Sequence, residues 1–271
     1  MSLSTIELTG IYIYPVKSLR GVRLEEAMLE DGRLAGDRNW LLVDSAGRFM
    51  HMRDYPQMAR VEATNAPRGL VVRRDGLPAL AIARPVDSGI EPSEVTHVRL
   101  WRRSAPVIPV SDEADDWFTR ALGVRCRLMA FVPTASALNV PHYEMHSSLQ
   151  DATPFHLTSE ESLADLNARM AAPIPMNRFR PNLVVRGAPA YAEDGWKTIT
   201  IGDTTLRWIK PCTRCVATTT DHETGERASR DPLYTLARYR RIGSTVVFGH
   251  YLVADTWGDR LRVGDGVAVV S

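Results

Sequence analysis

The sequence predicts a mainly β protein with a few helices, an α+β chain whose strands form barrel-like sheets. Short apolar stretches of strand length recur about every ten residues, separated by turns that contain Gly, Pro or Asp. Only three segments carry helix-start signals. With 271 residues, of which 44% are hydrophobic and 24% charged, the chain is long enough for one large or two small folded domains.

The first half of the chain is expected to consist mostly of strands. Apolar and polar residues alternate over 7–17, as in a strand with one buried face. Residues 39–44 and 48–52 flank a Ser-Ala-Gly turn, which is the pattern of a β-hairpin. Further strands are expected at 69–74, 79–84 and 95–102.

Three segments are expected to be helical. Residues 112–122 begin with acidic side chains, which suit the positive end of a helix dipole, and Gly123 would end the helix. The capping box at 158–161 predicts a helix over 162–170. A third helix is expected over 231–241, because a proline in its first turn is compatible with helical geometry.

Strands are expected to resume around these helices in the second half. The stretch 131–150 has no clear periodicity and is interpreted as a linker or an active-site loop. The predicted strands lie at 182–186, 197–201, 205–210, 216–220, 246–254, 261–263 and 267–270.

Composition excludes several classes of function. The 33 basic and 32 acidic residues give a net charge of +1, so no polybasic field recruits nucleic acid or a membrane. No apolar stretch approaches the roughly 18 residues of a transmembrane helix, and the N-terminus lacks a signal-peptide pattern. The three cysteines do not form a disulfide framework, which favours a reducing, cytoplasmic location.

The pair Cys212 and Cys215 has several interpretations. A structural zinc would need two more ligands, for which the sequence offers only a histidine pair at 142 and 146. A thioredoxin-like pair precedes a helix, whereas 216–220 is expected to be a strand. One cysteine could instead be a soft thiolate ligand for a redox metal, or both could be small residues in a turn.

Two further motifs suit an anionic ligand. Lys17 and Ser18 follow the first predicted strand and could donate to a phosphate, although the isolated motif is more typical of a solvated turn. Lysine is rare, since the other thirty basic residues are arginines; Lys197 and Lys210, the remaining lysines, are interpreted as surface residues.

Arginines recur at a second pair of sites. Arg38 follows a Gly-Asp pair, and Arg180 and Asn182 flank a proline at the start of a predicted strand. This arrangement could direct guanidinium and amide groups at one anionic ligand; the alternative is a set of surface ion pairs, which contribute little stability.

Taken in order, these motifs resemble the MOSC family, the molybdenum-cofactor sulfurase C-terminal domain. They resemble most its branch with an N-terminal β-barrel domain, which includes the mitochondrial amidoxime-reducing components and their bacterial counterparts. The resemblance covers nearly the whole chain, through Ile13–Ser18, Asp37-Arg38-x-Trp40, Asn177–Asn182, Tyr191–Trp196, Cys212–Cys215, Asp221–Gly225 and Phe248–Tyr251.

The resemblance implies an N-terminal β-barrel-like domain over 1–125 and a MOSC β-barrel domain over 126–271. It implies a molybdenum–molybdopterin cofactor whose metal is bound by Cys215, the catalytic residue, whereas Cys212 is not expected to bind metal. The stretch Asp151-Ala-Thr-Pro departs from the family's Asp-Thr-Ser-Pro. The residues implied to contact the cofactor are Lys17, Ser18, Arg38, Asp151, Ala152, Thr153, Arg180, Asn182, Thr213, Arg214 and Tyr251.

The implied activity is the reduction of small N-hydroxylated compounds: amidoximes, hydroxylamines and N-hydroxylated bases. Because no ferredoxin-type cysteine run is present, electrons are expected from a separate ferredoxin- or cytochrome-type protein and its reductase. Ala188-Pro189 replaces the family's Cys-Asp, which affects substrate scope and proton delivery. The alternatives are sulfur transfer through a Cys215 persulfide, with an external sulfur donor since no pyridoxal-phosphate domain is present, or transport of the cofactor without catalysis.

Overall fold

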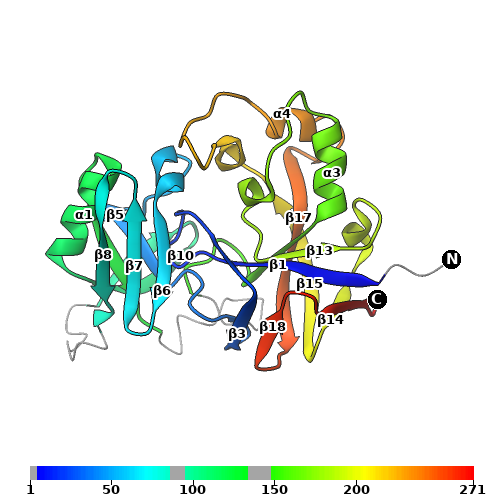
Figure 1. The fold of residues 1–271 in the computed structure, drawn as a ribbon, viewed down its shortest axis with the longest axis horizontal. Helices are drawn as coiled ribbons and strands as arrows, with labels where there is room; N and C mark the ends of the chain where they lie inside the picture. Colours follow the sequence, from blue (N-terminus) through cyan, green and yellow to red (C-terminus); the bar gives the residue numbers. More distant parts are fainter. Residues whose placement is uncertain (1–4, 86–94, 134–147) are drawn as a thin grey trace.

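The computed structural model describes residues 5–85, 95–133 and 148–271 and shows two β-rich lobes side by side (Figure 1). The protein is mostly β, with a closed seven-stranded barrel and a half-barrel, as the sequence predicts. No helix in these residues is long and apolar enough to cross a lipid bilayer.

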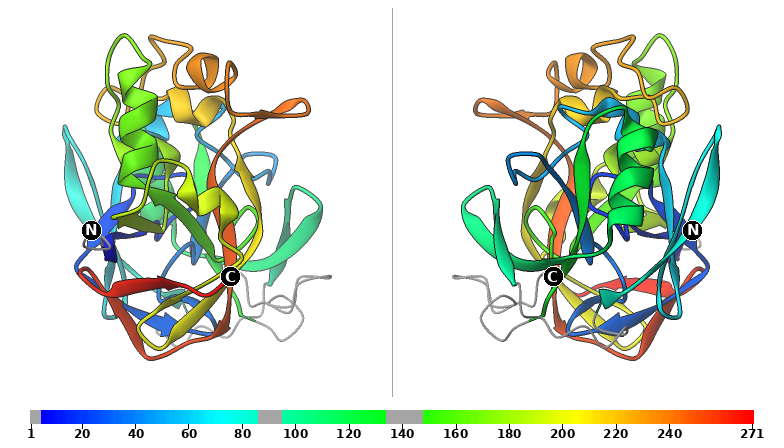
Figure 2. Two further views of the ribbon diagram at one scale, coloured as in Figure 1. Left: turned by 90° about the vertical axis from the view of Figure 1, so that its right-hand side faces the viewer. Right: turned by 90° about the vertical axis from the view of Figure 1, so that its left-hand side faces the viewer.

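The barrel forms the lobe that contains the first strand and the C-terminus (Figure 1), and this lobe faces the viewer in the left view of Figure 2. Its strands follow the order β12-β13-β1-β19-β14-β15-β17, and pairing of β12 with β17 closes the ring. Apolar side chains such as Leu8, Leu183 and Leu252 fill the barrel. The strands are β1 (Ile6–Ile13), β12 (Phe155–Ser159), β13 (Leu183–Arg186), β14 (Thr198–Ile201), β15 (Thr204–Thr213), β17 (Thr245–Thr256) and β19 (Gly266–Val269).

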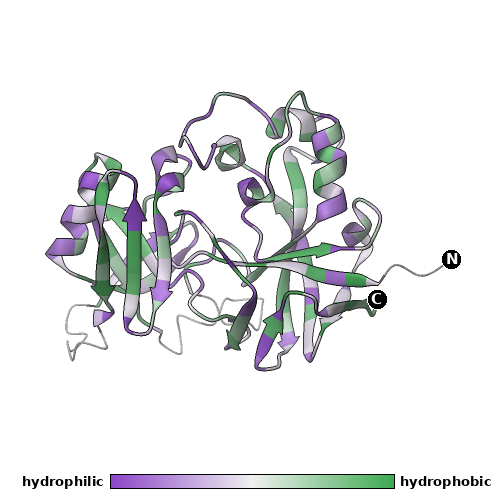
Figure 3. Ribbon diagram, in the orientation of Figure 1, coloured by the Kyte–Doolittle hydropathy of each residue, from purple (hydrophilic) through white to green (hydrophobic). Residues whose placement is uncertain are grey.

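The other lobe contains two sheets around a second core. A four-stranded sheet has the order β5-β11-β10-β9, and β6, β7 and β8 form a meander. The helix α1 (Asp112–Leu122) buries Trp117 and Phe118 in this core, to which hydrophobic residues of the strands also contribute (Figure 3). The strands are β5 (Trp40–Asp44), β6 (Glu62–Ala66), β7 (Gly69–Arg74), β8 (Leu77–Ala83), β9 (Thr96–Leu100), β10 (Arg103–Pro109) and β11 (Cys126–Phe131).

Several short elements add to the barrel lobe. A small sheet of order β18-β3-β4 packs its apolar side chains into the barrel core, β2 pairs with β1, and β16 pairs with β17. The strands β1 and β12 lie in the barrel, whereas β11, between them in the sequence, lies in the other lobe, so the chain crosses between the lobes more than once. The domain limit at 125/126 stays a prediction. The bounds are β2 (Val22–Leu24), β3 (Glu26–Glu30), β4 (Arg33–Leu34), β16 (Arg241–Ile242), β18 (Arg260–Arg262), and single turns η1 (Pro56–Arg60), η3 (Met176–Phe179) and η4 (Ala192–Gly195).

The first helix confirms its sequence prediction. Ser111 caps it by accepting from the Ala114 amide, and Gly123 ends it with a φ of 68°. The second helix, α3 (Glu160–Ala168), begins earlier than expected. Its cap is Ser159 rather than Thr158, because Ser159 is the last extended residue of β12 and its hydroxyl accepts from the Ser162 amide.

Three predicted elements are wrong in kind or length. The expected strand 216–220 is one 3-10 turn, η5 (Val216–Thr219), because two threonine hydroxyls bond back to local carbonyls. The third helix is only α4 (Leu233–Leu236), since the chain then pairs as β16. The second arm of the hairpin is a single bridge at Phe49.

Some predictions concern residues outside the described part of the chain. Most of the stretch 131–150 and both histidines of the 142/146 pair lie there. Eight strands had not been expected, including β6, β10, β11 and β12. The segments of β6, β10 and β11 mix buried and exposed residues without strict alternation, so their strand character depends on partners far along the chain.

Candidate cofactor site

Two adjoining cavities lie where the lobes meet, with volumes of about 330 and 120 Å³. Both are lined by Arg180, Arg214, Cys215 and Tyr251, so they form one continuous site. All of the residues singled out by the sequence line this site: Lys17, Ser18, Arg38, Asp151, Ala152, Thr153, Arg180, Asn182, Thr213, Arg214, Cys215 and Tyr251. Their roles toward a ligand stay predictions.

Two arginines pack on Tyr14 at the floor of the site. The guanidinium carbon of Arg38 lies 4.5 Å from the centre of the Tyr14 ring, and that of Arg180 lies 4.1 Å from it. The Tyr14 hydroxyl donates to the Pro181 carbonyl at 2.9 Å, which fixes the ring. A Cβ on Gly21 would lie 2.4 Å from that ring, so only glycine fits there.

The same two arginines are held close together although both are cations. Burial lowers the pKa of Arg180 to about 10, with Arg38 contributing, so both side chains remain charged at neutral pH. Arg38 pairs with the buried carboxylate of Asp37, and it reaches the Asn182 side-chain oxygen at 3.4 Å. Such a concentration of buried positive charge favours an anionic ligand.

Backbone strain is concentrated at the site. Ser18, Arg38 and Arg180 have φ values of 67°, 53° and 54°, in the left-handed region that side-chain-bearing residues seldom occupy. Each such residue costs of order 1–3 kcal/mol, and outliers of this kind cluster at functional sites. With Trp101, four of the six non-glycine residues with positive φ in the described chain line these two cavities.

Lys17 is buried, and its ammonium has two protein partners for its three N–H donors. Its ammonium donates to the Leu149 carbonyl at 2.8 Å and pairs with Asp151. The indole of Trp101 donates to the same carboxylate oxygen at 3.0 Å. Burial lowers the pKa of Lys17, while Asp151 acts in the opposite direction. Lys17 therefore organises the 149–151 segment as well as lining the cavity.

The two cysteines of the motif have different environments. Cys215 is exposed, precedes η5 and lines both cavities. Cys212 is buried, and its sulfur accepts from Arg214 at 2.6 Å and interacts with the Tyr251 hydroxyl. Burial raises the pKa of the Cys212 thiol. Both cysteines line the smaller cavity, but Cys212 is buried and already bonded, so Cys215 is the accessible sulfur.

The donor set indicates which kind of metal centre the site could hold. The described residues contain no group of three or more His, Cys, Asp or Glu side chains that could hold an ion. Buried Nε atoms of Arg178 and Arg214 also lack a hydrogen-bond partner in that part of the chain. One accessible cysteine beside unsatisfied cationic donors fits an anionic cofactor that brings its own metal ligands.

Sequence reasoning missed several residues that line the site. His156 is buried, with Nδ1 3.3 Å from the Arg180 carbonyl and Nε2 3.4 Å from Arg214; burial and Arg214 lower its pKa well below the usual value. No sequence signal marks this lone strand histidine. His51, Met52, Arg53, Trp101, Arg178 and Ala217 also line the cavities.

The two remaining lysines differ in their surroundings. Lys197 is exposed, as expected, with its ammonium 4.3 Å from the centre of the Trp208 ring. Lys210 is exposed too, but it lines the larger cavity next to Tyr251, its partner across β15 and β17. The prediction that Lys210 is only a surface residue is therefore incomplete, because it also lines the larger cavity. Its position three residues before Thr213 is the signal that could have indicated this.

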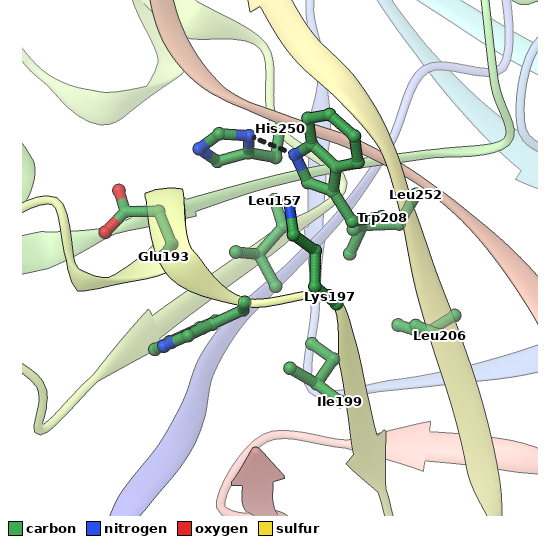
Figure 4. Close-up of a pocket in the computed structure, with 9 residues that line it drawn as sticks. Leu157, Glu193, Lys197, Ile199, Leu206, Trp208, His250 and Leu252 are labelled. Atoms are coloured by element: carbon green, nitrogen blue, oxygen red, sulfur yellow. Dashed lines mark hydrogen bonds between the residues drawn. The ribbon is translucent and has the colours of Figure 1, made fainter. Parts of the chain in front are cut away.

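A separate small cavity beside His250 lies within the barrel (Figure 4). The Trp208 indole donates to His250 Nδ1 at 2.8 Å, so the ring proton belongs on Nε2, which lies 2.8 Å from Asp194. The cavity volume is about 10 Å³, room for about one water. Its lining is mostly apolar, and we assign it a structural role.

The fold and the site define a two-lobed β-barrel protein with a cation-lined cavity and one accessible cysteine. Residues 5–125 match the model of the MOSC N-terminal beta barrel domain, and residues 144–268 match that of the MOSC domain. The chain therefore belongs to the MOSC family, in the branch that carries the N-terminal barrel.

Several curated proteins are similar along almost the whole chain. Mitochondrial amidoxime reducing component 2 of Bos taurus is 33% identical, covering 96% of this chain and 82% of the relative. Mitochondrial amidoxime-reducing component 1 of Homo sapiens is 32% identical, covering 95% and 81%. The molybdenum cofactor sulfurase of Arabidopsis thaliana is 30% identical over 90% of this chain but only 32% of its own length.

A solved structure also aligns with the chain. The YUAD protein from Bacillus subtilis covers 97% of this chain and 94% of its own, with a TM-score of 0.47 and 12% identity.

Proposed function

We propose that this protein is a molybdenum-cofactor-dependent oxidoreductase that reduces small N-hydroxylated compounds. The observation that supports it most is the Cys215 thiol facing a cation-lined cavity with unsatisfied arginine donors. The relatives named amidoxime-reducing components support the same reaction class.

The bound cofactor would supply the oxygen-accepting redox chemistry, with Cys215 as the protein ligand to its metal. Lys17, Ser18, Arg38 and Arg180 would hold the cofactor's phosphate, because they line the site and offer positive charge or, for Ser18, a hydrogen-bond donor. The remaining predicted contacts would come from Asp151, Ala152, Thr153, Asn182, Thr213, Arg214 and Tyr251.

Two neighbouring groups would keep fixed protonation states. Burial, together with Cys212, raises the pKa of Tyr251 well above 10, so its hydroxyl keeps its proton at neutral pH. The imidazole of His156 stays neutral under the same conditions. Tyr251 can therefore donate a hydrogen bond in the cavity, whereas His156 holds the Arg180 backbone.

The electrons would come from a separate ferredoxin- or cytochrome-type protein and its reductase. The described residues contain three free cysteines and no group of metal ligands that could hold a second redox centre. Reconstitution with candidate donor proteins, measured by the rate of N–O reduction, tests this part of the proposal.

The decisive experiment compares two cysteine variants of protein expressed with molybdate. We expect about one molybdenum per chain, because one accessible thiolate lines the site. Cys215→Ser should lose at least about 100-fold in benzamidoxime reduction with an artificial electron donor, since the metal loses its protein ligand. Cys212→Ser should retain metal and most activity. Full activity of molybdenum-free protein would refute the proposal.

A second candidate function is sulfur transfer or cofactor transport. It is favoured by the exposure of Cys215 and by the likeness to a molybdenum cofactor sulfurase. Mass spectrometry distinguishes the alternatives: a persulfide on Cys215 without bound pterin supports sulfur transfer. Bound cofactor without turnover of any N-hydroxylated substrate supports transport.

A further inference from the structure

Three aromatic side chains form a wall at one side of the larger cavity. They come from the lobe that contains the strands β5 to β11. We call Phe49, His51 and Trp101 the aromatic wall. The His51 and Trp101 rings are stacked, with centres 5.7 Å apart and planes 22° apart. Phe49 meets Trp101 edge-on at 5.0 Å, and the Arg53 guanidinium lies 4.0 Å from the Trp101 ring centre. These contacts hold the rings in one arrangement.

Trp101 occupies a position that its backbone disfavours. It is the first residue of the two-residue turn between β9 and β10, where Leu100 pairs with Arg103. Its φ is 56°, a value that such turns normally assign to Gly, Asn or Asp. A bulky residue there is strained, and observed strain of this kind points to function. Trp101 is also 40% exposed, so the ring is not there to fill a core.

The aromatic wall lies between two cavities and contributes lining residues to both of them. His51 and Trp101 line the larger cavity, which also contains Cys215. With Phe49, they also line another, outer cavity of about 550 Å³, which lies toward His97 and Arg99. The name larger cavity is kept for the cavity of about 330 Å³ beside Cys215. A flat molecule lying along the wall would therefore extend from the outer cavity toward the Cys215 sulfur.

The charge of the larger cavity restricts what can lie against the wall. Lys17, Arg53, Arg180, Lys210 and Arg214 line it, with Asp151 as the single carboxylate. Burial, with Arg53 contributing, lowers the pKa of His51, so this ring is uncharged at neutral pH. Arg53 and Lys210 lie outside the set expected to neutralise a cofactor, so positively charged ligands are disfavoured.

We propose that the aromatic wall is a stacking subsite for a planar aromatic ring without positive charge, which it orients toward Cys215. This proposal rests on the proposed function in one respect only, namely that the reacting group of the ligand is an N-hydroxylated one. The exposed part of the Trp101 ring, beside its contacts with His51 and Arg53, provides the stacking surface, because base-like rings stack on indole with little dependence on their substituents. Asp151 holds the Trp101 edge in place.

Binding of three matched probes that cannot undergo N–O reduction tests this subsite. Benzamide is planar and neutral, cyclohexanecarboxamide is neutral but not planar, and benzamidine is planar and cationic. Isothermal titration of the full-length protein, with no electron donor present, should show binding of benzamide in clear preference to both others. Trp101→Ala should weaken benzamide binding about 5- to 150-fold, the range expected for loss of one stack, and Trp101→Phe should retain most of it.

Trp257 provides the matched control. It is 43% exposed, similar to Trp101, and it lies against Gly32 rather than at either cavity. Trp257→Ala should leave benzamide affinity unchanged, and thermal melting of all variants checks that they are folded. Equal affinity of Trp101→Ala and wild type for benzamide, or equal binding of cyclohexanecarboxamide, would overturn the subsite.

The outcomes separate this inference from the proposed function. Trp101-dependent benzamide binding in a protein that reduces no N-hydroxylated compound keeps the subsite and refutes the reductase. Benzamidoxime reduction that is insensitive to Trp101→Ala, together with absent benzamide binding, keeps the reductase and refutes the subsite.

Discussion

At the scale of single residues, two equally buried histidines have opposite surroundings. His222 is 3% exposed, and neither ring nitrogen has a hydrogen-bond partner among the described residues. His250 is 4% exposed and is bonded at both nitrogens, to Trp208 and Asp194. Because unpaired buried polar groups destabilise a fold whereas paired ones do not, these histidines should respond differently to replacement.

We expect His222→Leu to keep or raise the free energy of unfolding at pH 7, by up to about 1 kcal/mol, since it removes unsatisfied polar atoms. His250→Leu should lower it by about 2–3 kcal/mol, because the Trp208 N–H and the Asp194 carboxylate would lose their partner. Urea denaturation of both variants measures the difference. A larger loss for His222→Leu than for His250→Leu would contradict this explanation.

The same histidine predicts a pH dependence. Burial, followed by the nearby Arg180 and Arg178, lowers the pKa of His222 to about 3, against 6.5 in the unfolded chain. Below pH 6.5 the unfolded state therefore binds a proton that the folded state does not bind. The free energy of unfolding consequently falls as pH falls toward 3. By pH 4 the loss should reach roughly 3 kcal/mol.

Urea denaturation at pH 7, 5.5 and 4 measures this slope. His222→Leu should remove most of the loss between pH 6.5 and 4 and leave the part that carboxyl groups produce at lower pH. An unchanged slope in the variant would assign the acid sensitivity to other groups.

At the scale of elements, the ends of α1 show how much local sequence decides. Gly123 ends the helix with a φ of 68°, and a Cβ added there would meet nothing within 4 Å. Gly123→Ala should therefore lower the free energy of unfolding by about 1 kcal/mol through backbone strain alone. Gly266→Ala, with open space and no positive φ, is the control and should cost nothing. Equal effects in thermal denaturation would contradict the strain argument.

The segment after Cys215 shows where element prediction fails. The stretch 216–220 is rich in threonine and valine, which favour strands in general. The hydroxyls of Thr218 and Thr219 instead bond to carbonyls three residues back, and the chain forms η5. This local competition between side chain and backbone cannot be read from propensity, yet it turns Cys215 toward the cavity.

At the scale of the whole molecule, one turn joins the lobes beside the site. The turn 221–225 packs on η1, where a Cβ on Gly225 would lie 3.2 Å from the Gln57 Cα. Just beyond it, Arg227 bonds to the Met52 carbonyl. This docking positions the 51–53 segment, which carries part of the aromatic wall.

Gly225→Ala should disturb this docking by a steric clash added to backbone strain. Gly243 is a matched control, because its φ of 58° is similar to the 72° of Gly225 but a Cβ there meets nothing within 4 Å. We expect Gly225→Ala to destabilise the protein by about 1–2 kcal/mol more than Gly243→Ala. Hydrogen exchange should show faster opening of 51–60 only in the first variant; equal exchange would contradict the docking role.

The sequence by itself determined the fold class, the limits of α1, and the motifs that converge on the site. These features are local: acidic residues in the first turn of a helix, Gly123 after it, and the spacing of the Cys212–Cys215 pair. The family resemblance identified the residues around Cys215, because it joins motifs too weak to interpret singly. All of them do line the two cavities.

Only the tertiary structure decided how distant segments combine. It placed β1 between β13 and β19, closed the barrel through β12 and β17, and brought Trp101 to Asp151. These contacts join residues far apart in the chain, and their free energy comes from burial and pairing that exist only after folding. The aromatic wall is therefore invisible in the sequence, although each of its residues is printed there.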